Sequence, residues 1–114
     1  MHVYGIKNCN TVKKALSWLE ENNIPYTFHD FKKEGVSEAK LHAWEEQTGW
    51  ERLVNKRGTT WRQLSPAEQS AVVDAASANQ LMRTKTSVIK RPVIESPKGI
   101  ILGFDETEYN AKLK

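Results

Sequence analysis

Strand and helix patterns alternate in the first third of the chain, and this alternation constrains the fold most. Residues 3–6 read as a short buried strand, in which Gly5 indicates the close approach of another backbone segment. A helix is predicted next, because apolar residues recur at helical spacing: Val12, Ala15, Leu16 and Leu19. Residues 25–31 are rich in aromatic and β-branched side chains, which is typical of a strand. The chain is therefore predicted to open as β-α-β.

The middle of the chain predicts helices. A polar turn is predicted at residues 32–35. Ser37 is placed to cap a following helix that carries Leu41 and Trp44 on its apolar side and stops at residues 48–49. These positions indicate a helical segment that starts soon after the second strand.

A capping box gives the sharpest helix signal in the chain. Residues 50–64 predict only a short helix followed by an irregular segment. The next four residues, SPAE at 65–68, form a capping box with proline at the first helical position. We therefore expect a helix from there to about Asn79, with a packing face made of Val72, Val73, Ala75 and Ala76.

The last quarter of the chain predicts two strands and a helix. Residues 92–95 and 99–102 read as strands joined by a tight turn, which makes a hairpin. Asp105, with Glu108 three residues later, predicts a capped C-terminal helix.

Taken together, the order β-α-β, helices and β-β-α predicts an α/β chain with a thioredoxin-like fold. At 114 residues we expect a single domain over 1–114, with a helical insertion of about residues 36–82 between its two halves.

Composition narrows the functional classes. The chain has one cysteine, which excludes an intrachain disulfide and favours a reducing compartment, so a cytoplasmic protein is expected. No segment predicts a leader or a membrane span. The formal net charge is only +3 and the basic residues are dispersed, so nucleic acid is not an expected partner. The three histidines share no metal-ligand spacing, and no metal site is predicted.

Cys9 is the main functional candidate because it lies between the first strand and the first helix. The N-terminal turn of a helix offers unpaired N–H groups and a partial positive charge, which favour the thiolate, the form that attacks. Lys7, Lys13 and Lys14 lie close in sequence and would add to this field if they point toward the sulfur. The alternative is a buried structural cysteine, whose pKa would be raised.

Three segments resemble the glutaredoxin-coupled arsenate reductase family, which also contains the Spx-type transcriptional regulators. The segment YGIKNCNT at residues 4–11 is similar to the family's nucleophile loop, and IKRPVI at residues 89–94 is similar to its Arg-Pro strand start. Residue statistics alone favour proline there as a plain strand start. The segment LVNKRGTTW at residues 53–61 looks most like the YffB subgroup, described as glutathione-dependent thiol reductases. The resemblance covers nearly the whole chain.

The resemblance implies a set of site residues. Cys9 would be the nucleophile, Arg91 would face its sulfur, and Thr11 would donate to the thiolate. Pro92 would be in the cis form beside them. The residues expected to contact substrate are Lys7, Asn8, Asn10, Arg57 and Pro92. A guanidinium in this position would lower the thiol pKa and hold an anionic group.

The chain also departs from the family pattern. Arsenate-reducing members use three arginines, and of these only Arg91 maps directly. The first position holds Asn55, with Arg57 two residues later, and no arginine lies near Gly103. The Spx-type Cys-x-x-Cys switch is absent, because Val12 stands three residues after Cys9. An intermediate on Cys9 would therefore be cleared by an external thiol, either glutathione or glutaredoxin.

We therefore predict a monomeric, thiol-dependent oxidoreductase with one nucleophilic cysteine. Glutathione is expected as its reducing co-substrate, with a disulfide or an oxyanion as the other substrate and no bound cofactor. Two alternatives stay open. One is an arsenate reductase coupled to glutathione and glutaredoxin, and the other is a non-catalytic Spx-like regulator that binds RNA polymerase.

Overall fold

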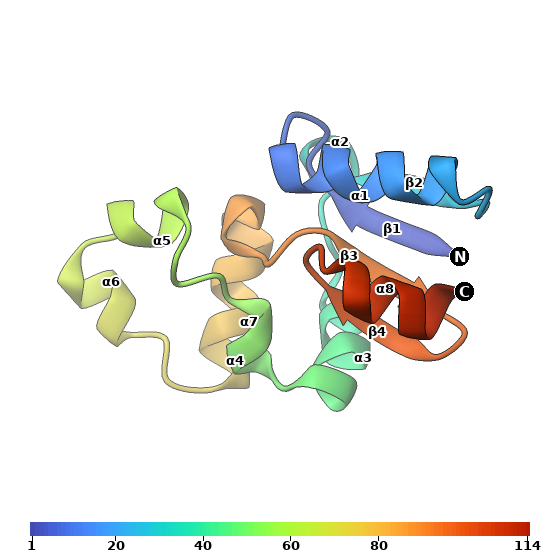
Figure 1. Cartoon of the computed structure of the whole chain (residues 1–114). Helices are drawn as coiled ribbons and strands as arrows, with labels where there is room; N and C mark the ends of the chain where they lie inside the picture. The colour runs from blue at the N-terminus through green and yellow to red at the C-terminus, as the bar shows by residue number, and fades with distance from the viewer. The chain divides into compact units, whose positions relative to one another are not determined.

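The computed structural model describes residues 1–114 and contains two compact units. The first unit combines residues 1–34 with residues 91–114, and the second consists of residues 35–90 (Figure 1). The first unit therefore brings together the two ends of the chain. It contains the sheet and three helices, and the second unit contains helices only.

The sheet of the first unit has four strands in the order β2-β1-β3-β4. The strands are β1 (His2–Gly5), β2 (Thr27–Asp30), β3 (Val93–Ser96) and β4 (Gly99–Leu102). Strands β1 and β2 are parallel, which confirms the predicted β-α-β opening, and β3 pairs with β1 and β4 in the antiparallel sense. The predicted hairpin of β3 and β4 is thus confirmed.

Helices α1 (Asn10–Glu21) and α8 (Glu106–Leu113) lie along the sheet of the first unit (Figure 1). They supply four of the buried residues of its core, namely Ala15, Trp18, Leu19 and Tyr109. The sheet supplies Val3, Ile94 and Ile101 to the same core. Because these side chains lose nearly all contact with water, their burial is the main force that holds the helices on the sheet.

The helix caps follow the sequence signals. Asp105 accepts a hydrogen bond from the backbone N–H of Glu108 at 3.2 Å and so starts α8, as predicted. Helix α1 ends at Glu21 with Asn22 as its C-cap, and Asn23 takes a positive φ of 56° that turns the chain toward β2.

Gly5 is required by close packing between β1 and α1. A Cβ atom built on Gly5 would lie 2.9 Å from Cγ2 of Val12, well inside van der Waals contact. A close approach at Gly5 is therefore present, but the side chain of Val12 makes it and not a backbone segment as predicted. This contact seats the first turns of α1 on the end of β1.

The second unit consists of short helices. They are α3 (Glu38–Thr48), α4 (Trp50–Leu53), α5 (Thr59–Gln63), α6 (Pro66–Ser70), α7 (Ala75–Thr84) and the 3-10 helix η1 (Thr86–Val88). Its buried apolar side chains include Leu41, Trp44, Leu53, Met82, Val88 and Ile89. A β-bridge between Val54 and Ile89 closes the unit. The helix from Ser37 to Thr48 agrees with the prediction, and Ser37 accepts from the N–H of Lys40 as its cap.

The single helix predicted from residue 65 to about Asn79 is wrong. The capping box of Ser65 and Glu68 is present, but α6 ends at Ser70. A second capping box, between Asp74 and Ser77, starts a separate helix. The predicted packing face fails with it, because Val73 lies between the helices with 70% of its surface exposed. The aspartate and serine side chains bind backbone N–H groups locally, which stabilises a new helix start over continuation of the old one.

Two smaller predictions also need correction. The polar turn predicted at residues 32–35 lies largely within α2 (Phe31–Glu34), a single helical turn. It is stabilised because Asp30 accepts from the N–H of Lys32 and Glu34 accepts from the N–H of Asp30. The segment predicted as irregular before residue 64 contains a second short helix, α5, which begins directly after Gly58.

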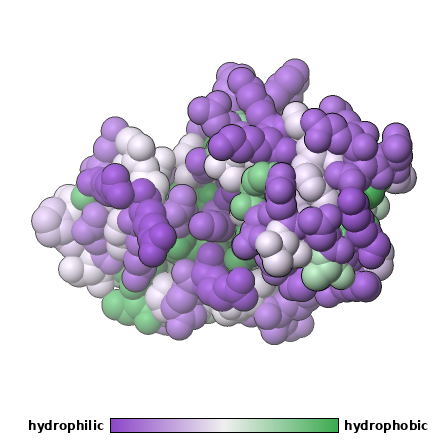
Figure 2. Space-filling view, in the orientation of Figure 1, coloured by the Kyte–Doolittle hydropathy of each residue, from purple (hydrophilic) through white to green (hydrophobic).

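The helical unit runs from residue 35 to residue 90, somewhat longer than the insertion predicted at about 36–82. No helix of the chain is both long and apolar enough to cross a membrane. Figure 2 shows a face on which hydrophilic residues predominate and apolar areas are small.

Candidate active site

Cys9 stands at the junction of the sheet and the first helix. Its N–H donates to the carbonyl oxygen of Ile6 at 3.1 Å, which folds the loop after β1 back on itself. Its own carbonyl oxygen accepts from the N–H of Lys13 at 2.9 Å, the first hydrogen bond of α1. Cys9 is therefore the N-cap residue of this helix, with an extended backbone (φ −92°, ψ 126°).

The surroundings of Cys9 favour its thiolate. Partial burial acts to raise its pKa, but the opposing effects are larger in sum, so the pKa of the Cys9 thiol lies below its ordinary value. The largest lowering effect comes from the backbone N–H of Val12, followed by a hydrogen bond and the positive charge of Arg91, and then the N–H of Thr11. The Cys9 side chain makes no regular capping hydrogen bond to the first turn of α1. The N–H groups of Val12 and Thr11 therefore act on the thiolate mainly through their partial positive charge.

Strand pairing explains why Arg91 reaches Cys9 across 82 residues of sequence. Strands β1 and β3 are antiparallel neighbours, with Tyr4 opposite Val93. The residues that precede β3 therefore lie beside those that follow β1. The Arg91–Pro92 peptide bond at the start of β3 is cis. The implied cis proline and the implied position of Arg91 next to the sulfur are both present.

The cysteine is accessible to substrate. Cys9 and Arg91 are both half-buried, and the loop residues on either side of Cys9 are exposed. The alternative of a fully buried structural cysteine with a raised pKa is therefore not supported. A partly exposed, stabilised thiolate can attack a disulfide.

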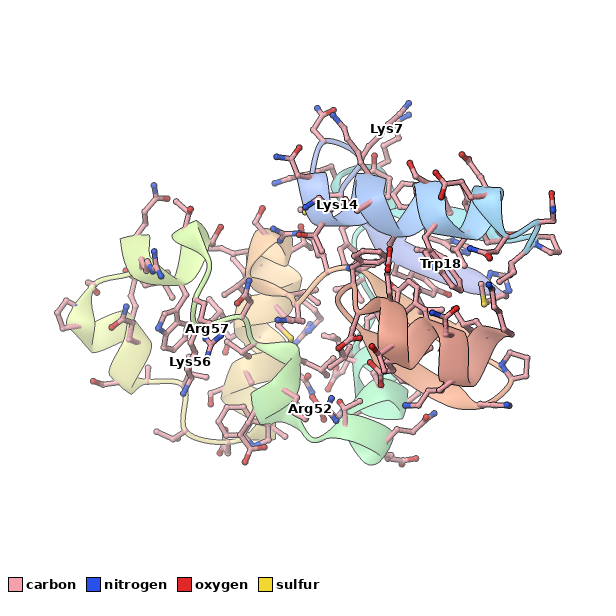
Figure 3. All side chains as sticks on the ribbon, viewed as in Figure 1. Lys7, Lys14, Trp18, Arg52, Lys56 and Arg57 are labelled. Atoms are coloured by element: carbon pink, nitrogen blue, oxygen red, sulfur yellow. The ribbon has the colours of Figure 1, made fainter.

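The structure places the other predicted residues in different ways. Lys7, Asn8 and Asn10 are exposed in and next to the loop that carries Cys9. Figure 3 shows Lys7 extending outward from that loop. The interaction of Thr11 with the sulfur comes from its backbone N–H, and donation by its hydroxyl stays a prediction. Arg57 is exposed in the helical unit, where its N–H donates to Oδ1 of Asn55, and its contact with substrate stays a prediction.

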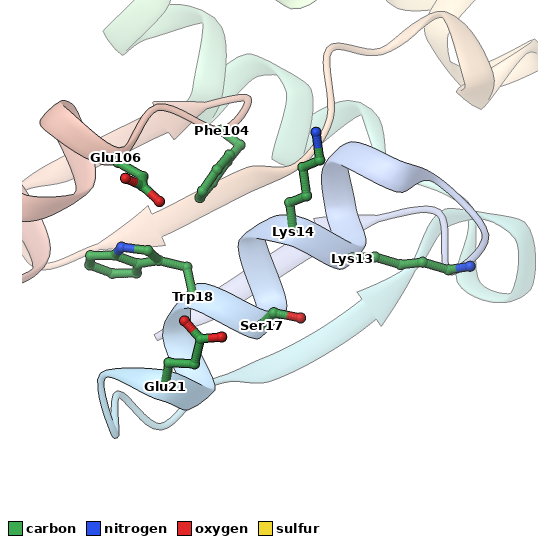
Figure 4. Close-up of a pocket in the computed structure, with 7 residues that line it drawn as sticks. All are labelled: Lys13, Lys14, Ser17, Trp18, Glu21, Phe104 and Glu106. Atoms are coloured by element: carbon green, nitrogen blue, oxygen red, sulfur yellow. The ribbon is translucent and has the colours of Figure 1, made fainter.

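Sequence reasoning missed a hollow in the first unit, between α1 and the segment that leads into α8. Its volume is about 360 Å³, and it is lined by Lys13, Lys14, Ser17, Trp18, Glu21, Phe104 and Glu106. Figure 4 shows the rings of Trp18 and Phe104 facing into it. The only sequence signal was the spacing of Lys14, Trp18 and Glu21, which puts them on one side of a helix.

Sequence reasoning also missed a polar cluster on the sheet. The ring nitrogens Nδ1 of His2 and Nε2 of His29 lie 2.8 Å apart, and Nδ1 of His29 contacts Oε1 of Glu34 at 3.2 Å. Tyr4 stacks on His29 with ring centroids 4.4 Å apart. These residues have no regular spacing along the chain, since only the parallel pairing of β1 with β2 brings them together.

Comparison with known proteins shows which family and which solved structures this chain resembles. The model of the ArsC family matches residues 4–112. A solved YffB protein superposes with a TM-score of 0.92 at 42% identity, covering 99% of this chain and 98% of that one. An uncharacterized protein of Haemophilus influenzae is 44% identical over 96% of this chain and 95% of its own length. The global transcriptional regulator Spx 1 of Bacillus cereus is 24% identical over 93% of this chain and 81% of its own length. The predicted thioredoxin-like fold is confirmed.

Proposed function

Because the chain belongs to the ArsC family, we propose that it is a thiol-dependent oxidoreductase with Cys9 as nucleophile and glutathione as its reducing co-substrate. One observation carries this proposal. The partly exposed Cys9 sulfur lies at the start of α1, where Arg91 donates a hydrogen bond to it and places a positive charge beside it. Both effects lower the pKa of the Cys9 thiol and so favour the thiolate, the form that attacks.

The reaction that fits this site is the reduction of a mixed disulfide with glutathione. The Cys9 thiolate attacks the glutathione sulfur of R–S–SG, a Cys9–glutathione disulfide forms, and R–S⁻ leaves and takes up a proton. A second glutathione, after losing its proton, attacks the glutathione sulfur held by Cys9. Oxidised glutathione forms and the Cys9 thiolate is regenerated. The sum is R–S–SG + GSH → R–SH + GSSG, which balances in atoms and electrons.

Arg91 would act in both halves of this cycle. In the first half its positive charge keeps a larger fraction of Cys9 as thiolate. In the second half Cys9 is the leaving group, and a thiol of lower pKa leaves faster. One positioned guanidinium would therefore support both attack on the substrate and release of the enzyme.

An external thiol must complete the cycle because the chain has no second cysteine. Cys9 is free, and Val12 occupies the place where a Cys-x-x-Cys motif would have its resolving thiol. The same absence removes the switch of the Spx-type regulators. For arsenate, Arg91 is the one arginine of the expected three that maps directly, and a doubly charged oxyanion would lack bidentate partners. These two points favour a disulfide substrate.

The first experiment measures the rate of Cys9 alkylation by iodoacetamide across pH for the wild type, Arg91→Ala and Arg62→Ala. Arg62 is an exposed arginine of α5 and serves as the matched control. We expect a wild-type pKa below the reference value of about 8.5 and a rise in Arg91→Ala only. An unshifted pKa in the wild type would contradict an activated nucleophile.

The second experiment measures turnover of a glutathione mixed disulfide with glutathione and glutathione reductase. We expect activity in the wild type and none in Cys9→Ser. Full activity in Cys9→Ser would refute the proposal. Turnover of arsenate with glutathione and glutaredoxin, lost in Arg91→Ala, would instead establish the arsenate reductase alternative. The regulator alternative would be established if the chain captured RNA polymerase equally well with Cys9→Ser and in the presence of oxidant.

A further inference from the structure

The hollow between α1 and the start of α8 begins within one helical turn of Cys9. Lys13 lines it, and the N–H of Lys13 donates to the carbonyl oxygen of Cys9. The opposite wall begins at Phe104, which follows Gly103, and the N–H of Gly103 donates to the carbonyl oxygen of Pro92 at 2.9 Å. Both walls therefore start next to the residues that surround the sulfur.

Charges change sign along this hollow. Lys14 lies on the first turns of α1, near Cys9, and Glu21 lies on its last turn. Seven residues of helix separate them by about 10 Å. Figure 4 shows Lys14 beyond Phe104 at one end, with the carboxylates of Glu106 and Glu21 on either side of Trp18 at the other. Lys13 extends away from Phe104 in the same view.

The floor between these charges is aromatic and pre-formed, and Nζ of Lys114 lies over the Trp18 ring, 5.7 Å from its centroid, where a bound side chain would displace it. Trp18 is 7% exposed, and its ring packs edge-on against that of Tyr109 with centroids 5.2 Å apart. Phe104 packs edge-on against the same tyrosine at 5.1 Å. Tyr109 thus holds both rings in place, so an apolar side chain meets a fixed surface.

We propose that this hollow binds the segment next to the reacting cysteine of a protein substrate, and that it selects an acidic, then an apolar, then a basic residue counted outward from that cysteine. The inference rests on the proposed function and specifies its substrate class. The acidic residue would pair with Lys14, the apolar residue would cover Trp18 and Phe104, and the basic residue would meet Glu21 and Glu106. An extended chain spans the required 10 Å or so with three to four residues.

The chemical step at Cys9 is the one given above, in which the peptide thiol is the leaving group. The Cys9 thiolate takes the glutathione from R–S–SG and R–SH is released. Binding of the flanking segment would orient the disulfide over the sulfur, so the segment contributes through position and not through a new reaction.

The test uses the full chain and synthetic peptides that carry glutathione on one cysteine. One pair extends toward the C-terminus, Cys-Glu-Phe-Gly-Lys and Cys-Lys-Phe-Gly-Glu, and a second pair carries the same residues on the N-terminal side. The measured quantity is the ratio of kcat/KM between the two members of a pair. This ratio cancels any change in the reactivity of Cys9 itself, because both peptides meet the same thiolate.

In at least one pair we expect the acidic-first peptide to react about three- to ten-fold faster, the range that two exposed ion pairs provide. In the double variant Lys14→Glu/Glu21→Lys we expect the preference to reverse. Lys33→Glu changes a lysine of α2 that does not line the hollow, and should leave the ratio unchanged. The preference should also shrink in high salt.

Equal rates in both pairs, or a ratio that the double variant leaves unchanged, would overturn this inference and leave the proposed function intact. A double variant that alters the reaction with oxidised glutathione but not the peptide ratio would also overturn it, because the hollow would then belong to glutathione. No Cys9-dependent release of thiol from any peptide would refute the proposed function itself.

Discussion

The N–H of Gly103 donates to the carbonyl oxygen of Pro92, and this bond joins the turn after β4 to the residue that follows Arg91. The carbonyl oxygen of Gly103 accepts from the hydroxyl of Tyr109, so both polar groups of this buried peptide segment are paired. Gly103 has a φ of 77°, in the left-handed region where glycine carries no Cβ penalty. One glycine therefore connects α8, the hairpin and the active-site side of β3.

Replacing Gly103 by alanine should lower stability and disturb the thiol. We expect a loss of about 1–2 kcal/mol in the free energy of unfolding, the cost of a left-handed alanine. Because the strain is next to Pro92, the pKa of Cys9 should also move toward its ordinary value. Urea unfolding and alkylation across pH measure the two effects.

Gly35→Ala is the matched control for Gly103→Ala. Gly35 has a similar φ of 68°, and a Cβ atom there meets no atom within 4 Å. It should lose stability but leave the alkylation of Cys9 unchanged. An equal change of the thiol pKa in both variants would contradict a specific role for Gly103.

Removing the hydroxyl of Tyr109 should leave a buried acceptor unpaired. Tyr109 is fully buried, and burial together with Glu108 raises its pKa far above the ordinary range, so the neutral hydroxyl donates at every accessible pH. We expect Tyr109→Phe to cost about 1–3 kcal/mol of unfolding free energy. Tyr26→Phe should cost less, because its bond to Glu20 is exposed to water. Equal losses in urea unfolding would be the contrary result.

The lowered pKa of Cys9 should make stability depend on pH. A thiol whose pKa is lower in the folded chain than in the unfolded chain stabilises the fold above its unfolded pKa, and that contribution is lost as pH falls through the folded pKa. The unfolding free energy of the wild type relative to Cys9→Ser should therefore rise with pH as pH approaches about 8.5 and level off above it.

This prediction is checked by urea unfolding of the two proteins under reducing conditions between pH 5 and about pH 9.5, on either side of the thiol reference pKa. Arg91→Ala provides the control, since it removes one cause of the shift and should flatten the pH dependence. A difference between wild type and Cys9→Ser that falls with rising pH would mean that burial dominates and that the thiolate is disfavoured.

Gly5 should not tolerate a side chain while Val12 is present. Gly5→Ala places a Cβ atom 2.9 Å from Cγ2 of Val12, and overpacking of this kind costs about 1–3 kcal/mol of unfolding free energy. Adding Val12→Ala removes the clashing methyl group, so the double variant should lose less than the sum of the two single variants. Strict additivity in urea unfolding would show that the clash is relieved in another way.

Local signals in the sequence predicted much of the fold. The caps made by Ser37, Ser65 and Asp105 are correct because each side chain binds an N–H group only three residues away. The position of Cys9 at the N-terminus of α1 follows from the same kind of local order. The resemblance to a known family added Arg91 and Pro92, which no local pattern connects to Cys9.

Local signals also failed where two of them competed. The capping box at Ser65 starts a helix as predicted, but the second capping box, at Asp74, starts a separate helix. Both helices are short, and the exposed Val73 between them contributes little burial to keep one long helix intact. Helix propensity over such a length is too weak to override a cap.

By itself, the sequence determined the order of the strands along the chain, the caps at Ser37, Ser65 and Asp105, and the place of Cys9 at a helix start. These features depend on spacing over a few residues. Only the tertiary structure decided which distant side chains meet. Antiparallel pairing of β1 with β3 puts Arg91 at Cys9, and parallel pairing of β1 with β2 puts His2 against His29. The register between strands sets these contacts, and it depends on burial of the whole core, which no short segment encodes.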